Sequence, residues 1–439
     1  MRNYRNFAAA MLLASGWQAN AAPVPIVDHH QHLLSPAGAD LVNPKATAIA
    51  VPSEIGRLLE ERARRWEDKA GLAKLYTDDA LIFGGDFSGW LKGPKAAADF
   101  FYNRFARAYR MTPSAYRGDD KTAGLGGYYT RAAGDGRHIG YFSMTLVKAP
   151  GGEWRIASET PMFPGPRYEE PVTGANMVKL LDEAGIRRAI VLSNAQYFDS
   201  ARAQQQGLQG VPALVRAEND WTAAEAERSG GRLIAFCSFN PLLAHALPEL
   251  KRCAEPKRFK GLKLHFETAG VDLLDADHAA KLRAVFAAAN RYRLPILVHA
   301  AFGGKQPYGA AQAQIFVDQL WPAARSIPVV MAHLWGGGGF SDEALKVYAD
   351  TVSTGQPQAR NLYFEVAQTQ LVARGSADTL QKIAMRIRQI GLGRVYYGSD
   401  GPQFGGQTPA QAWKEFREKV PLTPAEHDQL AGNIAPFLR

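Results

Sequence analysis

The chain has 439 residues and carries a formal net charge of +9. Its basic residues are spread along the sequence rather than gathered in runs, so they favour modest attraction to anionic small molecules and give no case for nucleic acid binding. Only two cysteines occur, Cys237 and Cys253, which excludes a disulfide framework. We expect two buried free thiols, with a single bridge as the alternative.

The first 21 residues have the pattern of a secretory signal peptide. Arg2 and Arg5 precede the apolar run 7–17, and residues 19–21 are small, as a cleavage position requires. The apolar run is too short to span a bilayer, and no later stretch is longer. We therefore expect a mature chain that begins near Ala22 and is periplasmic or secreted, without stable membrane insertion. The loss of the two arginines lowers the charge of +9 to +7.

Residues 26–33 read Ile-Val-Asp-His-His-Gln-His-Leu and combine a strand start with several potential metal ligands. Because alternate residues of a strand point to the same face, we expect Asp28, His30 and His32 on one side and His29 on the other. Two imidazoles spaced in this way bind one metal ion, and Asp28 would support them by hydrogen bonding. An incidental histidine-rich surface segment is the alternative.

Residues 53–165 form a unit of their own, with a helix-like stretch at 53–76 followed by strand-like runs around 128–131, 139–148 and 153–158. This predicts an inserted α+β domain, and its Gly-Gly-Glu-Trp hairpin resembles the closing hairpin of the NTF2-like (SnoaL-like) family. The unit follows the first strand of the barrel that the rest of the chain predicts, so it emerges at the catalytic face of that barrel. As a hypothesis it forms a lid, a substrate-selecting wall or a homodimer contact.

The rest of the chain alternates strands and helices. Eight strands are predicted, at 25–33, 189–195, 233–240, 261–267, 295–300, 328–334, 362–367 and 395–400. Helix-patterned segments between them include 175–185, 277–292 and 377–391. This alternation predicts an α/β fold, a (β/α)8 TIM barrel formed by residues 22–52 and 166–439. A doubly wound open sheet is the alternative, but it would not gather ligands from distant strands around one point.

Three later strands end in further potential ligands. His299 ends the fifth strand, His333 the sixth and Asp400 the eighth, each just before glycine or a loop, where a barrel strand opens onto the catalytic face. Alone, each histidine is more often a hydrogen-bonded core residue, and an Asp before Gly-Pro is first of all a turn residue. Taken with the first strand, they are what one shared ion requires from several strands.

These motifs resemble the amidohydrolase superfamily. The closest resemblance is to the amidohydrolase-related branch, which includes aminocarboxymuconate-semialdehyde decarboxylase-like enzymes and small lactone or amide hydrolases. The matching residues are Asp28-x-His30-x-His32, His299, His333 and Gly398-Ser399-Asp400-x-Pro402. The resemblance implies that His30, His32, His299 and Asp400 bind one divalent ion, and that His333 is a catalytic base or electrostatic partner.

The expected ion is zinc, held by neutral imidazoles and one carboxylate with an open position for water. Such an ion lowers the pKa of the water toward about 7. Asp400 would take the water proton and pass it to the leaving group, and His333 would orient or deprotonate the water or polarise a carbonyl.

The fourth strand adds Lys263 and His265, which share a face. In binuclear relatives a carboxylated lysine from this strand bridges two ions, so a second ion is one interpretation. A single ion, with Lys263 binding a substrate carboxylate, is the other. The glycine-rich segment 334–340 lacks the Lys-Ser/Thr ending of a phosphate loop and predicts an active-site loop in which Trp335 lines the pocket.

Three function classes follow, each with a small molecule as the partner. The first is metal-dependent hydrolysis of an amide, ester or lactone. The second is metal-dependent nonoxidative decarboxylation of a small unsaturated or aromatic acid, in which Lys263, Arg167 or Arg216 would hold the carboxylate. The third is a noncatalytic ligand-binding protein, against which the complete ligand set argues.

Overall fold

The computed structural model describes most of the chain. The described residues are 23–42, 47–83, 89–102, 109–132, 138–162, 171–200, 203–204, 207–255, 257–301, 308–355, 357–373, 376–401 and 407–439. The predicted signal peptide, Arg167, Pro402 and the predicted domain boundary at 165 and 166 lie outside these ranges. None of the helices within the ranges combines the length and hydropathy that a bilayer crossing requires.

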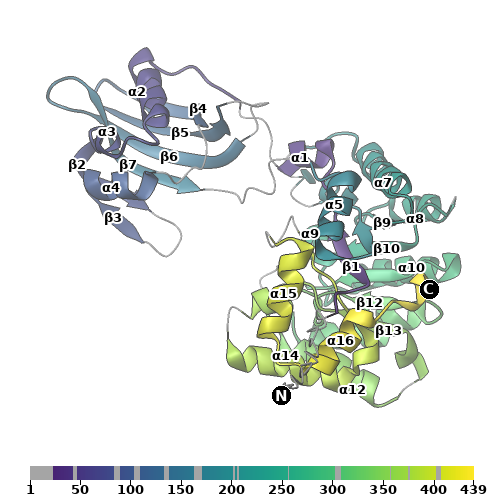
Figure 1. Cartoon of the computed structure of the whole chain (residues 1–439). Coiled ribbons are helices and arrows are strands. Elements are labelled where there is room, and N and C mark those ends of the chain that lie inside the picture. Colours follow the sequence, from purple (N-terminus) through teal and green to yellow (C-terminus); the bar gives the residue numbers. More distant parts are fainter. Residues whose placement is uncertain are drawn as a thin grey trace, which may run out of the picture.

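The larger unit is a barrel of eight parallel strands (Figure 1). In order around the sheet they are β1 (Val27–His32), β8 (Arg188–Leu192), β9 (Leu233–Ser238), β10 (Gly261–His265), β11 (Ile296–His299), β12 (Val329–Met331), β13 (Leu362–Glu365) and β14 (Val395–Tyr396). Two hydrogen bonds between β1 and the segment that follows β14 close the barrel: His29 N donates to Tyr397 O at 2.9 Å, and Asp400 N donates to His30 O at 2.7 Å. The TIM barrel prediction is therefore confirmed, and the open doubly wound sheet is excluded.

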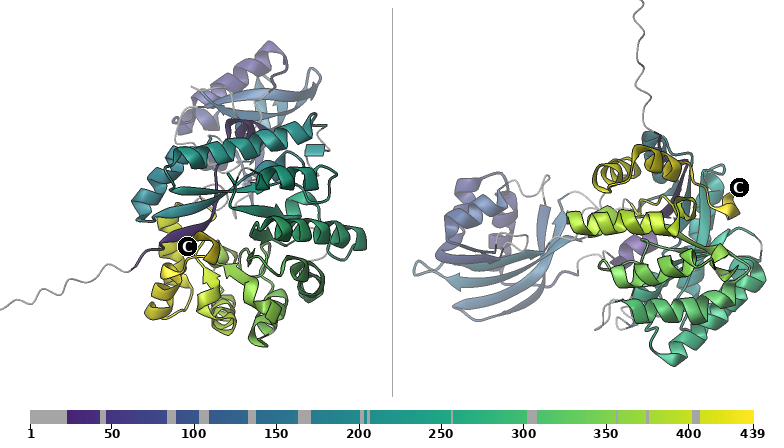
Figure 2. Two further views of the ribbon diagram at one scale, coloured as in Figure 1. Left: turned by 90° about the vertical axis from the view of Figure 1, so that its right-hand side faces the viewer. Right: turned by 90° about the horizontal axis from the view of Figure 1, so that it is seen from below.

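Helices cover the outside of the barrel, as both views in Figure 2 show. The α-helices are α1 (Pro36–Val42), α5 (Gly174–Ala184), α7 (Val211–Arg228), α8 (Ala246–Ala254), α9 (Phe266–Ala269), α10 (Ala276–Tyr292), α11 (Ala310–Ile315), α12 (Asp342–Ser353), α13 (Thr369–Val372), α14 (Ala377–Ile390), α15 (Pro409–Lys419) and α16 (Pro424–Gly432). The shorter 3-10 or π segments are η2 (Ala195–Tyr197), η3 (Phe316–Leu320), η4 (Trp321–Ala324), η5 (Pro357–Asn361), η6 (Leu392–Arg394) and η7 (Pro436–Leu438). The predicted helices match α5, α10 and α14. Each begins where a side chain, of Thr173, Asp275 or Ser376, accepts from a backbone N–H of the first turn.

The alternation of side chains along the strands directs the predicted site residues into the barrel interior. One cluster collects apolar side chains from most strands and from the C-terminal segment: Val27, Ile190, Leu192, Phe236, Leu297, Val330, Tyr396, Ala435 and Leu438. Leu297 belongs to this inner cluster, whereas Val298 packs in the larger core under the helices. Because side chains alternate along a strand, His299 faces the interior again, two positions nearer the carboxyl end.

A bulge in β1 changes the predicted arrangement of the first strand. Asp28 pairs with Ala189 but Gln31 pairs with Val191, so three steps along β1 match two along β8. Asp28 Oδ2 therefore accepts from Gln31 Nε2 and from the Ser399 hydroxyl, both at 2.7 Å, instead of facing the rings of the histidines. The expectation that Asp28 shares a face with His30 and His32 is wrong, because strict alternation does not continue through a bulge.

The side chain of His29 faces away from those of His30 and His32, as expected. Its ring stacks on Tyr396 with centroids 4.8 Å apart. Its Nδ1 lies 2.9 Å from Tyr397 O, and its Nε2 accepts from Ala435 N at 3.2 Å. Both ring nitrogens are used in packing the C-terminal segment against the barrel, so His29 is a packing residue.

The second unit is an α+β domain that Figure 1 shows beside the barrel. Its six strands lie in the order β3 (Trp90–Lys92), β2 (Tyr76–Phe83), β7 (Trp154–Met162), β6 (His138–Lys148), β5 (Thr122–Arg131) and β4 (Tyr109–Gly118). Only β2 and β7 pair in parallel among these strands. Its helices are α2 (Ser53–Arg64), α3 (Lys69–Ala73) and α4 (Pro94–Phe101). The α+β class is confirmed.

The single helix predicted at 53–76 is wrong in its extent. The first helix, α2, ends at Arg64, and a second helix, α3, begins after Asp68, whose side chain accepts from Gly71 N at 2.8 Å. From Ala80 to Phe83, buried and exposed side chains alternate, and the segment from Tyr76 forms β2 rather than a helix.

The core of the inserted domain contains a buried ion pair. Arg62 and Glu159 have fully buried side chains, and Arg62 Nη2 lies 3.2 Å from Glu159 Oε1. Arg62 also donates to the hydroxyls of Tyr76 at 2.8 Å and Tyr109 at 2.7 Å, while Tyr76 and Tyr129 donate to Glu159 at 2.5 and 2.7 Å. Each charged group is thus satisfied inside the domain, which gives the cluster a structural role.

Candidate metal centre

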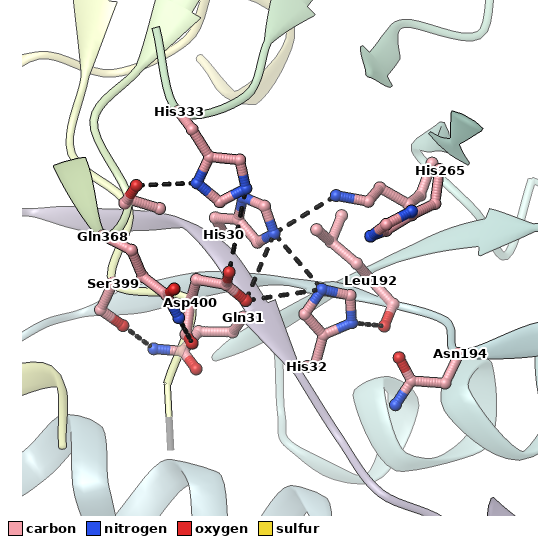
Figure 3. Close-up of polar contacts among 12 residues, drawn as sticks. His30, Gln31, His32, Leu192, Asn194, His265, His333, Gln368, Ser399 and Asp400 are labelled. Atoms are coloured by element: carbon pink, nitrogen blue, oxygen red, sulfur yellow. Dashed lines mark hydrogen bonds and ion pairs between the residues drawn. The ribbon is translucent and has the colours of Figure 1, made fainter. Parts of the chain in front are cut away.

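Three predicted ligand atoms converge at the carboxyl ends of β1 and β14 (Figure 3). His30 Nε2 and His32 Nε2 lie 3.3 Å apart, and Asp400 Oδ1 lies 3.5 Å from the first and 3.7 Å from the second. All three atoms fall within 4.8 Å of one another. Asp400 Oδ1 is buried and has no hydrogen-bond partner among the described residues. An orphaned carboxylate oxygen beside two imidazole nitrogens is a donor set that fits a divalent ion.

The tautomers of two histidines suit this arrangement. His32 Nδ1 lies 3.1 Å from Leu192 O, and His333 Nδ1 lies 2.7 Å from Ala367 O. A carbonyl oxygen only accepts, so each Nδ1 carries the proton in the neutral ring. The lone pair of each ring is then on Nε2, and His333 Nε2 lies 3.9 Å from Asp400 Oδ2.

The site keeps its histidines neutral. Burial, followed by the positive charge of Lys263, lowers the pKa of His30 and His32 well below the usual value and that of His333 to about 4. Burial and the neighbouring rings lower the pKa of His299 in the same way. A neutral imidazole is the form that binds a metal ion, so the electrostatics favour chelation at neutral pH.

Lys263 lies beside these groups. Its Nζ is 3.3 Å from His30 Nε2, the atom that an ion would also contact. Burial lowers the pKa of Lys263 to about 8, although Asp400 and Glu365 oppose the shift. Burial also raises the pKa of the Asp400 carboxyl well above its usual range, with Lys263 opposing. A bound cation would compensate the buried carboxylate, and the depressed pKa of Lys263 lowers the cost of a neutral amine beside it.

His299 lies in the same site but outside the three converging atoms. Its ring stacks on that of His265 at 3.9 Å, and its Nε2 is buried without a hydrogen-bond partner among the described residues. Gly337 covers the ring with φ of +102°, and a Cβ there would come within 2.4 Å of it. The close approach therefore requires glycine at this position.

The glycine-rich loop differs from its prediction in one respect. Gly337 and Gly338 line the cavity, whereas Trp335 is fully buried in the core and donates its Nε1–H to Gly337 O at 2.8 Å. The large apolar ring of Trp335 anchors the loop instead of lining the pocket.

The residues after the strands have unusual backbone angles. His333, Gln368 and Asp400 have φ of +54°, +56° and +51°, a region that side chains other than glycine seldom adopt. Gln368 Nε2 donates to Asp400 O at 3.0 Å and helps to hold that conformation. Such strain at three strand ends around one cavity is typical of a functional site.

Sequence reasoning missed Glu365, at the end of β13. It is fully buried, and its Oε1 lies 2.8 Å from His30 Nδ1. His30, His333 and Glu365 also satisfy the distances of a metal-binding group. Glu365 lies near the end of the predicted strand 362–367, where an acidic side chain is a potential ligand, so the signal that identified Asp400 could have identified it.

Arg216, predicted to hold a substrate carboxylate, lies outside the cavity lining, with its Nε 3.8 Å from Glu249 Oε2. Seven other predicted site residues line one cavity of about 390 Å³. They are His30, His32, Lys263, His265, His299, His333 and Asp400. Glu267, at the start of α9, adds a half-exposed carboxylate with its Oε2 3.7 Å from His299 Nε2. The volume suits a small molecule.

Comparisons with known proteins identify a family and several similar solved structures. Residues 159–435 match the family model described as Amidohydrolase. No curated protein matches the chain. Solved structures with a similar fold include the 5-carboxyvanillate decarboxylase LigW from Sphingomonas paucimobilis, 17% identical, covering 58% of this chain and 79% of that one, with a TM-score of 0.39.

Two other solved structures match over a comparable part of the chain. A 2,6-dihydroxybenzoate decarboxylase from Rhizobium is 15% identical, covers 58% of this chain and 84% of its own, and has a TM-score of 0.39. A probable 2-pyrone-4,6-dicarboxylic acid hydrolase from Acinetobacter baumannii is 16% identical, covers 60% and 87%, and has a TM-score of 0.40. The family model covers more than half of the 439 residues, and the chain belongs to the amidohydrolase family.

Proposed function

We propose that the protein is a metal-dependent hydrolase that cleaves an amide, ester or lactone bond of a small molecule. The observation that carries this proposal is the orphaned Asp400 Oδ1, which lies 3.5 and 3.7 Å from the Nε2 atoms of His30 and His32. A divalent ion, expected to be zinc, would be held by these residues and His299. When bound, it supplies the positive charge that polarises a carbonyl and makes water acidic.

The proposed roles of the protein groups follow from their positions. The second oxygen of Asp400, Oδ2, lies 3.9 Å from His333 Nε2. In the proposed reaction, Asp400 accepts the proton of the attacking water and returns it to the leaving group. His333, held by its Nδ1–H, presents Nε2 to the water or to the substrate carbonyl. Gly337 lets the loop pass close to the ring of His299, and Gly338 lines the same cavity.

The second candidate is nonoxidative decarboxylation. Lys263 favours it, since a buried ammonium in the cavity could hold a carboxylate. Glu267 opposes it, because its carboxylate in the cavity lining would repel the carboxylate of an acid substrate, whereas the charge of Asp400 is compensated when the ion is bound. We therefore keep decarboxylation as the second candidate.

An assay on a panel of lactones, esters, amides and hydroxybenzoates separates these functions. We expect the metal-loaded protein to release acid from a lactone, ester or amide without carbon dioxide. Carbon dioxide release from a hydroxybenzoate, with no hydrolysis of any ester or amide, would replace this proposal by the decarboxylase.

The inserted domain is proposed to select the substrate at the cavity mouth. Replacing residues 53–165 with a short linker should leave a metal-binding barrel, because all the proposed ligands lie outside the deletion. Substrate affinity or selectivity should change, since loops at this face form the pocket while strand ends supply the chemistry.

This test first requires a folded deletion variant with its metal intact, because the deletion could expose apolar surface. Circular dichroism and elemental analysis establish both points. Unchanged kinetic constants on the best substrate would then exclude the lid and leave a dimer contact as the role of the insertion.

A further inference from the structure

We infer that Glu365 is a positioning residue that sets the tautomer of His30 and, at the same time, the placement of His333. This inference rests on the metal centre of the proposed function but concerns a residue that the proposed ligand set does not contain. Glu365 ends β13, which pairs with β12, and its side chain has no exposed surface.

The first line of support is the set of atoms that surround the carboxylate. Oε1 lies 2.8 Å from His30 Nδ1 and accepts from His333 N at 3.0 Å, and Oε2 accepts from Ala367 N at 2.6 Å. Both backbone groups can only donate. A carboxylate so placed therefore favours a third donor, which is the Nδ1–H of His30.

The tautomer of His30 decides where its lone pair lies. With the proton on Nδ1, Nε2 offers its lone pair toward His32 Nε2, Lys263 Nζ and Asp400 Oδ1, at 3.3, 3.3 and 3.5 Å. With the proton on Nε2, that lone pair is lost to the site. Glu365 thus determines whether His30 is a ligand.

The same carboxylate places His333 in two ways. It binds the backbone N–H of His333, whose φ of +54° needs support, and it binds the N–H of Ala367. Ala367 in turn accepts from His333 Nδ1 at 2.7 Å through its carbonyl oxygen. One side chain therefore connects the ring of His30 with the backbone and the ring of His333.

The last strand leaves room for this arrangement. A Cβ on Gly398 would lie 2.7 Å from Glu365 Oε2 and 2.8 Å from His30 Cβ. Glycine at this position of the Gly-Ser-Asp motif lets the strand pass close to the carboxylate.

A direct ligand role for Glu365 is the competing interpretation, since His30, His333 and Glu365 lie close enough to bind an ion together. Both carboxylate oxygens already accept backbone N–H groups, however, and the nearest nitrogen of His30 is Nδ1 rather than Nε2. These contacts place Glu365 behind the ring of His30, away from the Nε2 side that Asp400 faces.

The variant Glu365→Gln tests the inference with nearly unchanged size. An amide must turn its NH2 group either toward Ala367 N–H or toward His30 Nδ1. The first orientation displaces Ala367 and with it His333, and the second favours the His30 tautomer with the proton on Nε2. We expect the dissociation constant for zinc to rise by about ten- to a hundredfold.

The matched control is Glu249→Gln, which removes a buried carboxylate of α8 that is bonded to Asn219 and Arg252 and lies outside the cavity lining. Its zinc affinity should equal that of the unchanged protein. Nitrogen NMR of the metal-free proteins gives the second measurement: His30 should carry its proton on Nδ1 in the unchanged protein. In Glu365→Gln either that preference is lost or the amide signal of Ala367 shifts, according to which way the new NH2 group turns. His32 is bonded to Leu192 O and should not change.

Unchanged zinc affinity together with an unchanged His30 tautomer would overturn the inference. Complete loss of zinc, with an unchanged tautomer and an unchanged Ala367 amide signal in the metal-free variant, would overturn it in favour of direct ligation. The proposed function fails separately, if the unchanged protein binds no divalent ion, and the NMR result on metal-free protein still decides the role of Glu365.

Discussion

Replacing Asp400 with asparagine is expected to lower turnover by a factor of about a hundred or more, while metal binding weakens only modestly. The amide keeps the shape and one oxygen of the side chain, so part of the metal interaction survives. It cannot accept the proton of the attacking water, which the proposed reaction requires. The measurement is the turnover number at saturating metal, with metal content determined on the same sample.

The control for this variant is Asp342→Asn, the same chemical change in an ion pair with Arg386 at the start of α12. It should leave turnover unchanged. If the metal-replete Asp400→Asn protein kept near-normal turnover, Asp400 would have no essential part in proton transfer, and that role would pass to His333.

A large effect on stability is expected from Glu159→Ala in the inserted domain. The change leaves the guanidinium of Arg62 buried without its carboxylate, and it removes the acceptor of the Tyr76 and Tyr129 hydroxyls. Loss of one partner of a buried ion pair costs about 3–5 kcal/mol of unfolding free energy. Urea unfolding, with hydrogen exchange to locate the change within 53–162, measures it.

Glu54→Ala is the comparison, because Glu54 is exposed and pairs with Lys148 on the surface of the same domain. Its effect should stay within about 0.5 kcal/mol. A Glu159→Ala protein as stable as Glu54→Ala would show that the buried cluster does not hold the domain together.

The barrel could be predicted because its strands are short apolar runs with a ligand at the end. Leu297 and His299 show why this works: the period of two that buries the leucine also carries the histidine into the interior. The same period places Lys263 and His265 in one cavity. These are local properties, so the sequence contains them.

Features that depend on a neighbouring strand could not be predicted in this way. The bulge between Asp28 and Gln31 exists only in the pairing with β8, and one hydrogen-bond partner of Asp28, Ser399, lies 371 residues away. Glu365 is 335 residues from His30, and no local sequence pattern predicts that the two side chains lie in contact. In the insertion, the glycine-rich start of β5 hides its strand character, since glycine contributes no alternating side chain.

Elemental analysis of the purified protein and of its His30→Ala and His32→Ala variants tests the metal centre most directly. His278→Ala serves as the control, because His278 accepts from Asp272 N and lies outside the cavity lining. We predict about one divalent ion per chain in the unchanged protein and the control, and loss of most of it in both variants while the barrel stays folded. Near-stoichiometric metal in both His30→Ala and His32→Ala would contradict the assignment of this pair to the metal centre.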